Sequence, residues 1–248
     1  MNTAVLLVEG ITEAILVKQI LLLIFNPDKI SIQVFYRYQS TGSYNVPDYC
    51  PNEPQTVFNI WIVGNDEKVV STLHENADNL LRKGVIKVIG LRDLYSQRYE
   101  DRLKRKNKFP LKVYHDVNRE FIDNATLQLR KSQKIKLLFS IMEIETWILS
   151  FTNIFPKINR DLLPIQIKEK TGYDLINDNL EEYYRPSHIL NEILKLIGKT
   201  YHKKISEILM LTSHISPEDI NNSESFVASF GLFMDEIKQI DRNSLSMR

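Results

Sequence analysis

The sequence predicts an α/β fold in which a parallel sheet is flanked by helices and is followed by a helical C-terminal part. Short apolar runs alternate with helical patterns over the first 150 residues, an order typical of chains that cover both faces of a parallel sheet. After about Trp147 the strand patterns stop, and helical spacing continues to the C-terminus. We therefore expect an α/β domain at residues 1–150 and a helical region at residues 151–248.

Five segments of the first domain have the apolar or alternating pattern of a strand. These segments are Ala4–Val8, Ile30–Tyr38, Phe58–Val63, Val85–Leu91 and Ile135–Ile141.

Helical patterns separate most of these strands. Thr12 is a suitable N-cap for a helix that reaches Phe25 and stops before Pro27. A second helical stretch runs from about Val69 to Arg82, and a third runs from Val117 to Leu129. These connections are those expected between neighbouring strands of a parallel sheet.

The C-terminal region contains several helix signals. Residues 187–197 have apolar side chains at helical spacing, and Ser216 followed by Pro217 is a typical helix start. Further apolar side chains recur at steps of four and three, which predicts that they share one helix face. These residues are Phe226, Phe230, Phe233, Ile237 and Ile240.

The composition is that of an ordinary globular protein. Of the 248 residues, 43% are hydrophobic and 25% are charged, which excludes disordered, collagen-like and coiled-coil chains. The longest apolar run, Ile20–Phe25, is far shorter than the roughly 20 residues of a membrane helix, and no signal peptide pattern is present. The single cysteine, Cys50, excludes an internal disulfide or a zinc knot. We expect a soluble, cytoplasmic protein.

Positive charge is concentrated in one segment. Residues 97–136 carry 12 Lys or Arg against 5 Asp or Glu, while the parts on either side are mildly acidic. Such a segment either directs a polyanion to one face of the protein or forms a solvated basic helix without a ligand. Tyr95 and Tyr99 accompany the basic residues, and their rings are suited to stacking on unpaired bases. The predicted nucleic-acid-binding residues are Tyr95, Arg98, Arg102, Lys104, Arg105, Lys106 and Lys108.

Carboxylates follow three of the predicted strands. Glu9 comes after the first strand, Asp93 after the fourth, and Glu143 with Glu145 after the fifth. The carboxyl ends of parallel strands line one edge of a sheet, where ligands normally bind. Clustered carboxylates favour a cation between them, and oxygen ligands suit Mg²⁺ or Mn²⁺. The alternative is that each acid occupies a solvated loop, as acids at strand ends commonly do.

Four segments together resemble a known family. Residues 8–13 (VEGITE) resemble the opening motif of Toprim domains, with two glutamates in E-x-x-x-E spacing. Residues 89–95 (IGLRDLY) occupy the place of the D-x-D strand, and residues 140–147 (SIMEIETW) resemble the later acidic motif. The sequence is most similar to overcoming-lysogenization-defect (OLD) nucleases and to small stand-alone Toprim-like proteins of bacterial defence loci. The motif at residues 201–203 (YHK) and the helical end resemble the stand-alone proteins.

This resemblance implies a Toprim/Rossmann-like sheet and a nuclease that hydrolyses phosphodiester bonds in DNA or RNA with Mg²⁺ or Mn²⁺. It also implies a role in anti-phage defence, a separate ATPase partner and the possibility of a homodimer. The metal ligands it implies are Glu9, Asp93 and Glu143. The full set of implied catalytic residues is Glu9, Glu13, Asp93, Glu143, Glu145 and Lys203. For Lys203, the alternative is an exposed helix end without a catalytic role.

The sequence departs from the family pattern at one position. Tyr95 replaces the second aspartate of D-x-D and so removes one expected metal ligand. Either Glu143, Glu145 or a water takes its place, or the chain is a non-catalytic Toprim-like module that binds nucleic acid or a protein. A different phosphoryl transfer on the same acids, such as primase-like or phosphatase chemistry, is a third interpretation.

Overall fold

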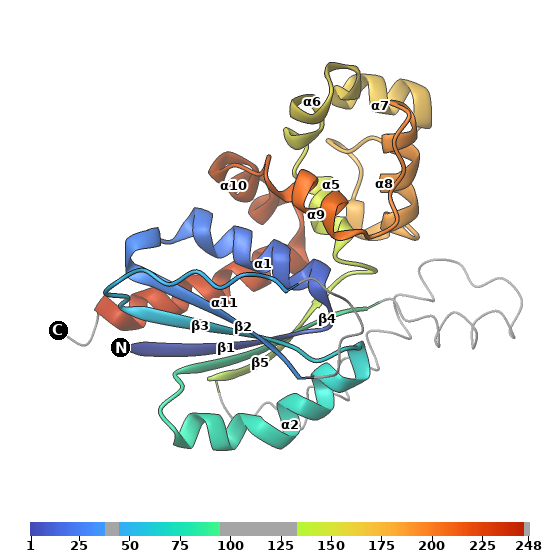
Figure 1. Cartoon of the computed structure of the whole chain (residues 1–248). Coiled ribbons are helices and arrows are strands. Elements are labelled where there is room, and N and C mark those ends of the chain that lie inside the picture. Colours follow the sequence, from blue (N-terminus) through green and yellow to red (C-terminus); the bar gives the residue numbers. More distant parts are fainter. Residues whose placement is uncertain (38–44, 95–132, 246–248) are drawn as a thin grey trace, which may run out of the picture. The chain divides into compact units, whose positions relative to one another are not determined.

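The sheet has five parallel strands in the order β2-β3-β1-β4-β5, and helices flank it (Figure 1). The computed structural model describes residues 1–37, 45–94 and 133–245. A helical C-terminal part follows the last strand. The predicted α/β fold class is thereby confirmed.

All five predicted strands are present, with shifts at their ends. The strands are β1 (Asn2–Val8), β2 (Ile30–Tyr36), β3 (Thr56–Ile62), β4 (Lys87–Asp93) and β5 (Ile135–Ser140). The first strand lies at the centre, and its Leu7 is in register with Trp61 of β3 and Gly90 of β4. The two strands next to β1, which are β3 and β4, therefore both run parallel to it.

Two helices precede the last strand within the described residues. They are α1 (Ile11–Ile24) and α2 (Asp66–Arg82), and a short 3-10 turn, η1 (Pro27–Lys29), follows the first. Thr12 is not the N-cap as predicted, because α1 already begins at Ile11. The N-cap of α2 is Asn65, whose side chain accepts a hydrogen bond from the Lys68 N–H. The predicted helix at residues 117–129 lies outside the described residues.

The C-terminal part contains seven helices among the described residues. They are α5 (Glu145–Ser150), α6 (Ile154–Ile158), α7 (Pro164–Thr171), α8 (Pro186–Lys195), α9 (Ile205–Thr212), α10 (Pro217–Phe226) and α11 (Ala228–Leu245), with 3-10 turns η2 (Arg160–Leu162) and η3 (Leu180–Glu182). The predicted helix start at Ser216 is confirmed, because Ser216 and Asp219 form a capping box at the start of α10.

The chain forms two compact units, each assembled from separate stretches of sequence. The first comprises residues 1–10, 27–139 and 236–248, and it contains the sheet and α2. The second comprises residues 11–26 and 140–235, and it contains α1 together with the helices from α5 to the start of α11. The sequence predicted a single boundary at residue 150. In the structure the chain passes from one unit to the other more than once, so neither unit is one continuous stretch of sequence.

Helix α2 packs closely on the sheet within the first unit. Gly90 of β4 faces this helix: a Cβ at that position would lie 3.1 Å from Val69 Cγ1 and 3.3 Å from Leu73 Cδ2. Glycine is thus the residue that permits this approach of helix and strand. Lys87 of the same strand forms an ion pair with Glu236 of α11, which also belongs to this unit.

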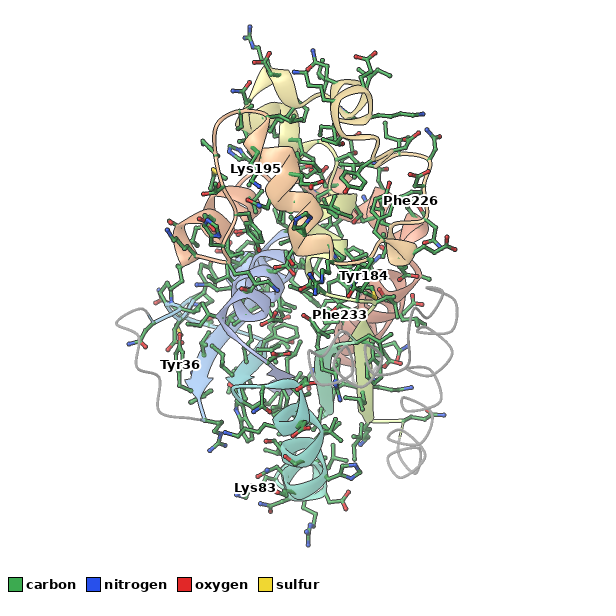
Figure 2. All side chains as sticks on the ribbon, turned by 90° about the vertical axis from the view of Figure 1, so that its right-hand side faces the viewer. Tyr36, Lys83, Tyr184, Lys195, Phe226 and Phe233 are labelled. Atoms are coloured by element: carbon green, nitrogen blue, oxygen red, sulfur yellow. The ribbon has the colours of Figure 1, made fainter. Side chains whose placement is uncertain are left out.

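An aromatic cluster forms the core of the second unit. The Trp147 ring centroid lies 5.1 Å from that of Phe230 and 5.2 Å from that of Phe233, and the Trp147 Nε1–H donates to Ser229 Oγ at 2.9 Å. The predicted single face from Phe226 to Ile240 is wrong at its first member. Phe226 ends α10 and is 41% exposed, while Phe233 on α11 is fully buried; both are labelled in Figure 2.

No helix among the described residues is long and apolar enough to span a membrane.

Candidate functional site

The predicted catalytic residues belong to two different units of the chain. Glu9 and Asp93 belong to the first unit, and Glu13, Glu143, Glu145 and Lys203 belong to the second.

Glu9 and Asp93 lie at the same edge of the sheet. Strands β1 and β4 are parallel neighbours with Val8 in register with Leu91, so the residues that follow reach the same carboxyl edge. Asp93 is the last residue of β4 and is buried. The Glu9 carbonyl accepts the Gly64 N–H at 2.8 Å, which holds the turn after β1 against the end of β3.

Arg92 fixes the end of β4 beside this edge. Its Nε–H donates to the Asp93 carbonyl at 3.2 Å, and its Nη2 lies 2.6 Å from Asp66 Oδ2 in the first turn of α2. The buried guanidinium therefore links the last residues of the strand to the helix start. Glu9 and Asp93 both carry carboxylates, the kind of ligand that commonly holds Mg²⁺ in proteins together with waters.

In the second unit, Lys203 lies between Glu143 and Glu145. Lys203 Nζ is 3.1 Å from both Glu145 Oε1 and Glu145 Oε2, and it is 3.4 Å from Glu143 Oε1. The Glu145 side chain is fully buried, whereas that of Lys203 is 41% exposed. One ammonium thus bridges two carboxylates, with the buried one bound through both oxygens.

Two further donors bind the same two carboxylates. The Ser187 N–H donates to Glu143 Oε2 at 2.9 Å, and the Tyr201 hydroxyl donates to Glu145 Oε1 at 2.8 Å. Ser187 is the second residue of α8, and the N-cap Arg185 makes no side-chain capping bond. Glu143 therefore acts as the cap of α8 from a distant segment, where its negative charge is favoured by the helix dipole.

The segments around this cluster have unusual backbone geometry. Met142, Arg185 and Lys203 have φ values of 67°, 54° and 57°, and they are the non-glycine residues of positive φ in the part of the chain that the structure describes. Met142 precedes Glu143, whose N–H bonds to the Ile141 carbonyl at 3.1 Å in a tight turn. Left-handed backbone is unfavourable for such side chains, and strain of this kind concentrates at functional sites.

Neighbouring groups hold the Lys203 backbone on both sides. Glu207 Oε2 accepts the N–H groups of His202 at 2.7 Å and Lys204 at 3.0 Å, and Asn191 Oδ1 accepts that of Tyr201 at 2.9 Å. The same Glu207 contacts cap the start of α9. The residue between His202 and Lys204 is consequently fixed in its left-handed conformation.

Burial raises the pKa of the Glu145 carboxyl above its ordinary value of 4.5. The Lys203 charge opposes this rise, the Glu143 charge adds to it, and smaller effects come from the Tyr201 hydrogen bond and the Glu13 charge. Burial also raises the pKa of the Tyr201 hydroxyl, and the Glu145 charge raises it further. Tyr201 therefore remains a protonated donor to Glu145.

The structure thus brings together Glu143, Glu145 and Lys203, with Glu13 close enough to act on Glu145 electrostatically. Across residues 1–37, 45–94 and 133–245, no three His, Cys, Asp or Glu side chains are arranged to hold a metal ion. The predicted nucleic-acid-binding residues, from Tyr95 to Lys108, lie outside the described residues.

Sequence reasoning missed several partners of the cluster. Ser187 binds Glu143 through its backbone N–H. The sequence signal for this was Pro186, because proline at the first helical position marks a helix start, where backbone N–H groups are free to bind an acid. Glu207 lies three residues after Lys204, a capping-box spacing visible in the sequence.

Neither the family models, the curated proteins nor the solved structures compared with this chain include a match.

Proposed function

We propose that this chain is a divalent-metal-dependent nuclease that hydrolyses phosphodiester bonds in DNA or RNA. The observation that carries the proposal is the position of Glu9 and Asp93 at the ends of two adjacent parallel strands. This edge is where open α/β sheets bind ligands, and carboxylate oxygens are the donors that Mg²⁺ and Mn²⁺ prefer. The likeness of residues 8–13 to the Toprim opening motif supports the same assignment.

Glu9 and Asp93 are the residues that would hold the metal. When bound, such an ion stabilises the charge on a phosphodiester and lowers the pKa of an attacking water. Arg92 keeps the end of β4 in place through its bonds to Asp93 and Asp66. For Glu9, which directly follows β1 at the same edge, we propose the role of a ligand or of the base that accepts a proton.

The biological setting we propose is bacterial anti-phage defence in the cytoplasm. A separate ATPase partner and a homodimer belong to this proposal, and both rest on the resemblance to OLD nucleases and small Toprim-like defence proteins. The basic segment at residues 97–136 supports nucleic acid as the ligand, because its charge favours phosphate contacts.

A second candidate is a non-catalytic module that binds nucleic acid or a protein. The observation that favours it is the cluster of the second unit, where the Lys203 ammonium occupies the place between Glu143 and Glu145. Tyr95, in place of a second aspartate, points in the same direction.

Cleavage of a mixed panel separates the two candidates. Plasmid, linear duplex, single-stranded DNA and total RNA are incubated with Mg²⁺, Mn²⁺ or a chelator. A nuclease cuts at least one substrate with metal, and the variants Glu9→Ala and Asp93→Ala lose the cutting. The control is Glu53→Ala, which removes an exposed loop carboxylate and leaves cutting unchanged.

The remaining outcomes are equally informative. Cutting that survives both variants contradicts the assignment of Glu9 and Asp93. Salt-sensitive binding without cutting, both for the protein alone and after addition of a candidate ATPase partner, supports the binding module.

A further inference from the structure

We propose that the Lys203 ammonium is the built-in cation of the Glu143–Glu145 pair, so that this pair excludes divalent metal in the native chain and binds one when Lys203 is replaced by an uncharged residue. This goes beyond the proposed nuclease activity and holds whether or not the protein cleaves nucleic acid. It removes Glu143 and Glu145 from the metal ligands of the proposed nuclease and leaves Glu9 and Asp93 in that role.

Three oxygen atoms of the pair already surround one cation, the Lys203 ammonium. Nζ of Lys203 is equidistant from both oxygens of Glu145, at 3.1 Å, in the manner of a cation bound by a bidentate carboxylate. Glu143 supplies a third oxygen at 3.4 Å. These separations suit an ammonium, since Mg²⁺ requires oxygens at about 2.0–2.1 Å and Ca²⁺ at about 2.3–2.6 Å.

The charges around the pair demand a cation at this position. Glu143 and Glu145 repel each other, and the charge of Glu13 also acts on Glu145. The donors of Tyr201 and Ser187 are a neutral hydroxyl and a backbone N–H, which bind oxygens without cancelling the charge. If the ammonium is removed, the carboxylates must bind protons or another cation.

The position of the ammonium is determined by the surrounding structure. Lys203 has left-handed backbone with φ 57°, and Glu207 binds the N–H groups of the residues on both sides. A surface lysine that pairs by chance needs no such arrangement. Lys204, the next residue, is exposed and provides a matched control.

The test counts Mn²⁺ ions bound per chain by electron paramagnetic resonance of the free ion at neutral pH. All variants carry Glu9→Gln and Asp93→Asn, so that the metal of the proposed nuclease does not contribute. Lys203→Met is expected to bind one Mn²⁺ more than the parent, and Lys204→Met is expected to bind the same number as the parent. Adding Glu145→Gln to Lys203→Met is expected to abolish the extra ion.

A second comparison keeps the test decisive if Lys203→Met fails to fold, as judged by circular dichroism. In the parent with Lys203 intact, Glu145→Gln is expected to leave Mn²⁺ binding unchanged. A decrease in that comparison would show that metal already occupies the pair and would overturn the proposal. A folded Lys203→Met that binds no additional Mn²⁺ would also overturn it. Loss of nuclease activity, by contrast, is measured separately on Glu9→Ala and bears only on the proposed function.

Discussion

Replacing Lys203 by methionine should destabilise the protein in a manner that depends on pH. The substitution keeps an unbranched side chain that is one atom shorter and leaves Glu143 and Glu145 without their ammonium. Removing one partner of a fully buried ion pair costs about 3–5 kcal/mol. Because the Lys203 side chain is 41% exposed and partly hydrated, we discount this to about 2 kcal/mol. That loss corresponds to a Tm lower by roughly 4–8 °C for a chain of this size.

The sign of the pH dependence follows from Glu145. Burial raises its pKa above 4.5 in the folded protein, and Lys203 opposes that rise, so the variant has a still higher pKa. As pH falls through the folded pKa toward 4.5, Glu145 becomes neutral in both proteins and the ammonium has less charge to compensate. The difference in stability between wild type and Lys203→Met is therefore largest near neutral pH and shrinks in acid.

Urea unfolding followed by circular dichroism at pH 7.5 and at pH 4.5, with chelator present, measures this difference. Lys204→Met is the control and should change the free energy of unfolding by less than about 0.5 kcal/mol. An equal loss in Lys204→Met, or a loss in Lys203→Met that is the same at both pH values, would refute the reasoning.

Three further predictions concern single positions. Gly90→Val should lower the free energy of unfolding by roughly 1–3 kcal/mol, since its Cβ would press on Val69 and Leu73; an unchanged urea midpoint would contradict the packing. The stability of the wild type should decline as pH rises from 4.5 through the folded pKa of Glu145, and Glu145→Gln should show a smaller decline. Unfolding curves of both proteins across that pH range test this. Asp93→Asn should lower the Mg²⁺-dependent cleavage rate by more than about 100-fold, and a rate near that of wild type would exclude Asp93 as a ligand.

The sheet was predictable because its strands are buried and apolar. The run Ala4–Val8 lies in a strand that is covered on both sides, and a continuous apolar pattern is what such a strand requires. Helix boundaries were less predictable. Apolar periodicity begins at Val69, yet α2 starts a turn earlier at Asp66, because the first turn is polar and is held by the Asn65 cap.

The apolar periodicity also predicted one helix face where the structure has two helices, α10 and α11. Phe226 and Phe230 have the four-residue spacing of one face, but Val227 between them has extended backbone and ends α10. The spacing is preserved across the break, so the pattern carried no sign of it. The consequence is that Phe226 is exposed while Phe230 enters the core.

The acids of the candidate site could be predicted from the sequence, but the groups that bind those acids could not. Glu143 and Glu145 were found from their place after a strand, whereas the N–H of Ser187 is a backbone group that no side-chain pattern identifies. The bridging role of Lys203 depends on its left-handed φ, and lysine has no preference for that conformation. Contacts between residues about 60 positions apart come from tertiary packing alone.

The backbone around the cluster argues that its geometry serves more than stability. Met142 and Lys203 belong to separate segments that deliver Glu143 and the ammonium, and both have a conformation that costs roughly 1–2 kcal/mol for a non-glycine residue. An ion pair needed only for stability is weakly favourable, and exchange for apolar residues is often neutral or stabilising. A chain under selection for stability alone would gain by relieving this strain. Left-handed backbone at two segments that meet at one ammonium therefore supports the hypothesis that this cluster has a chemical role.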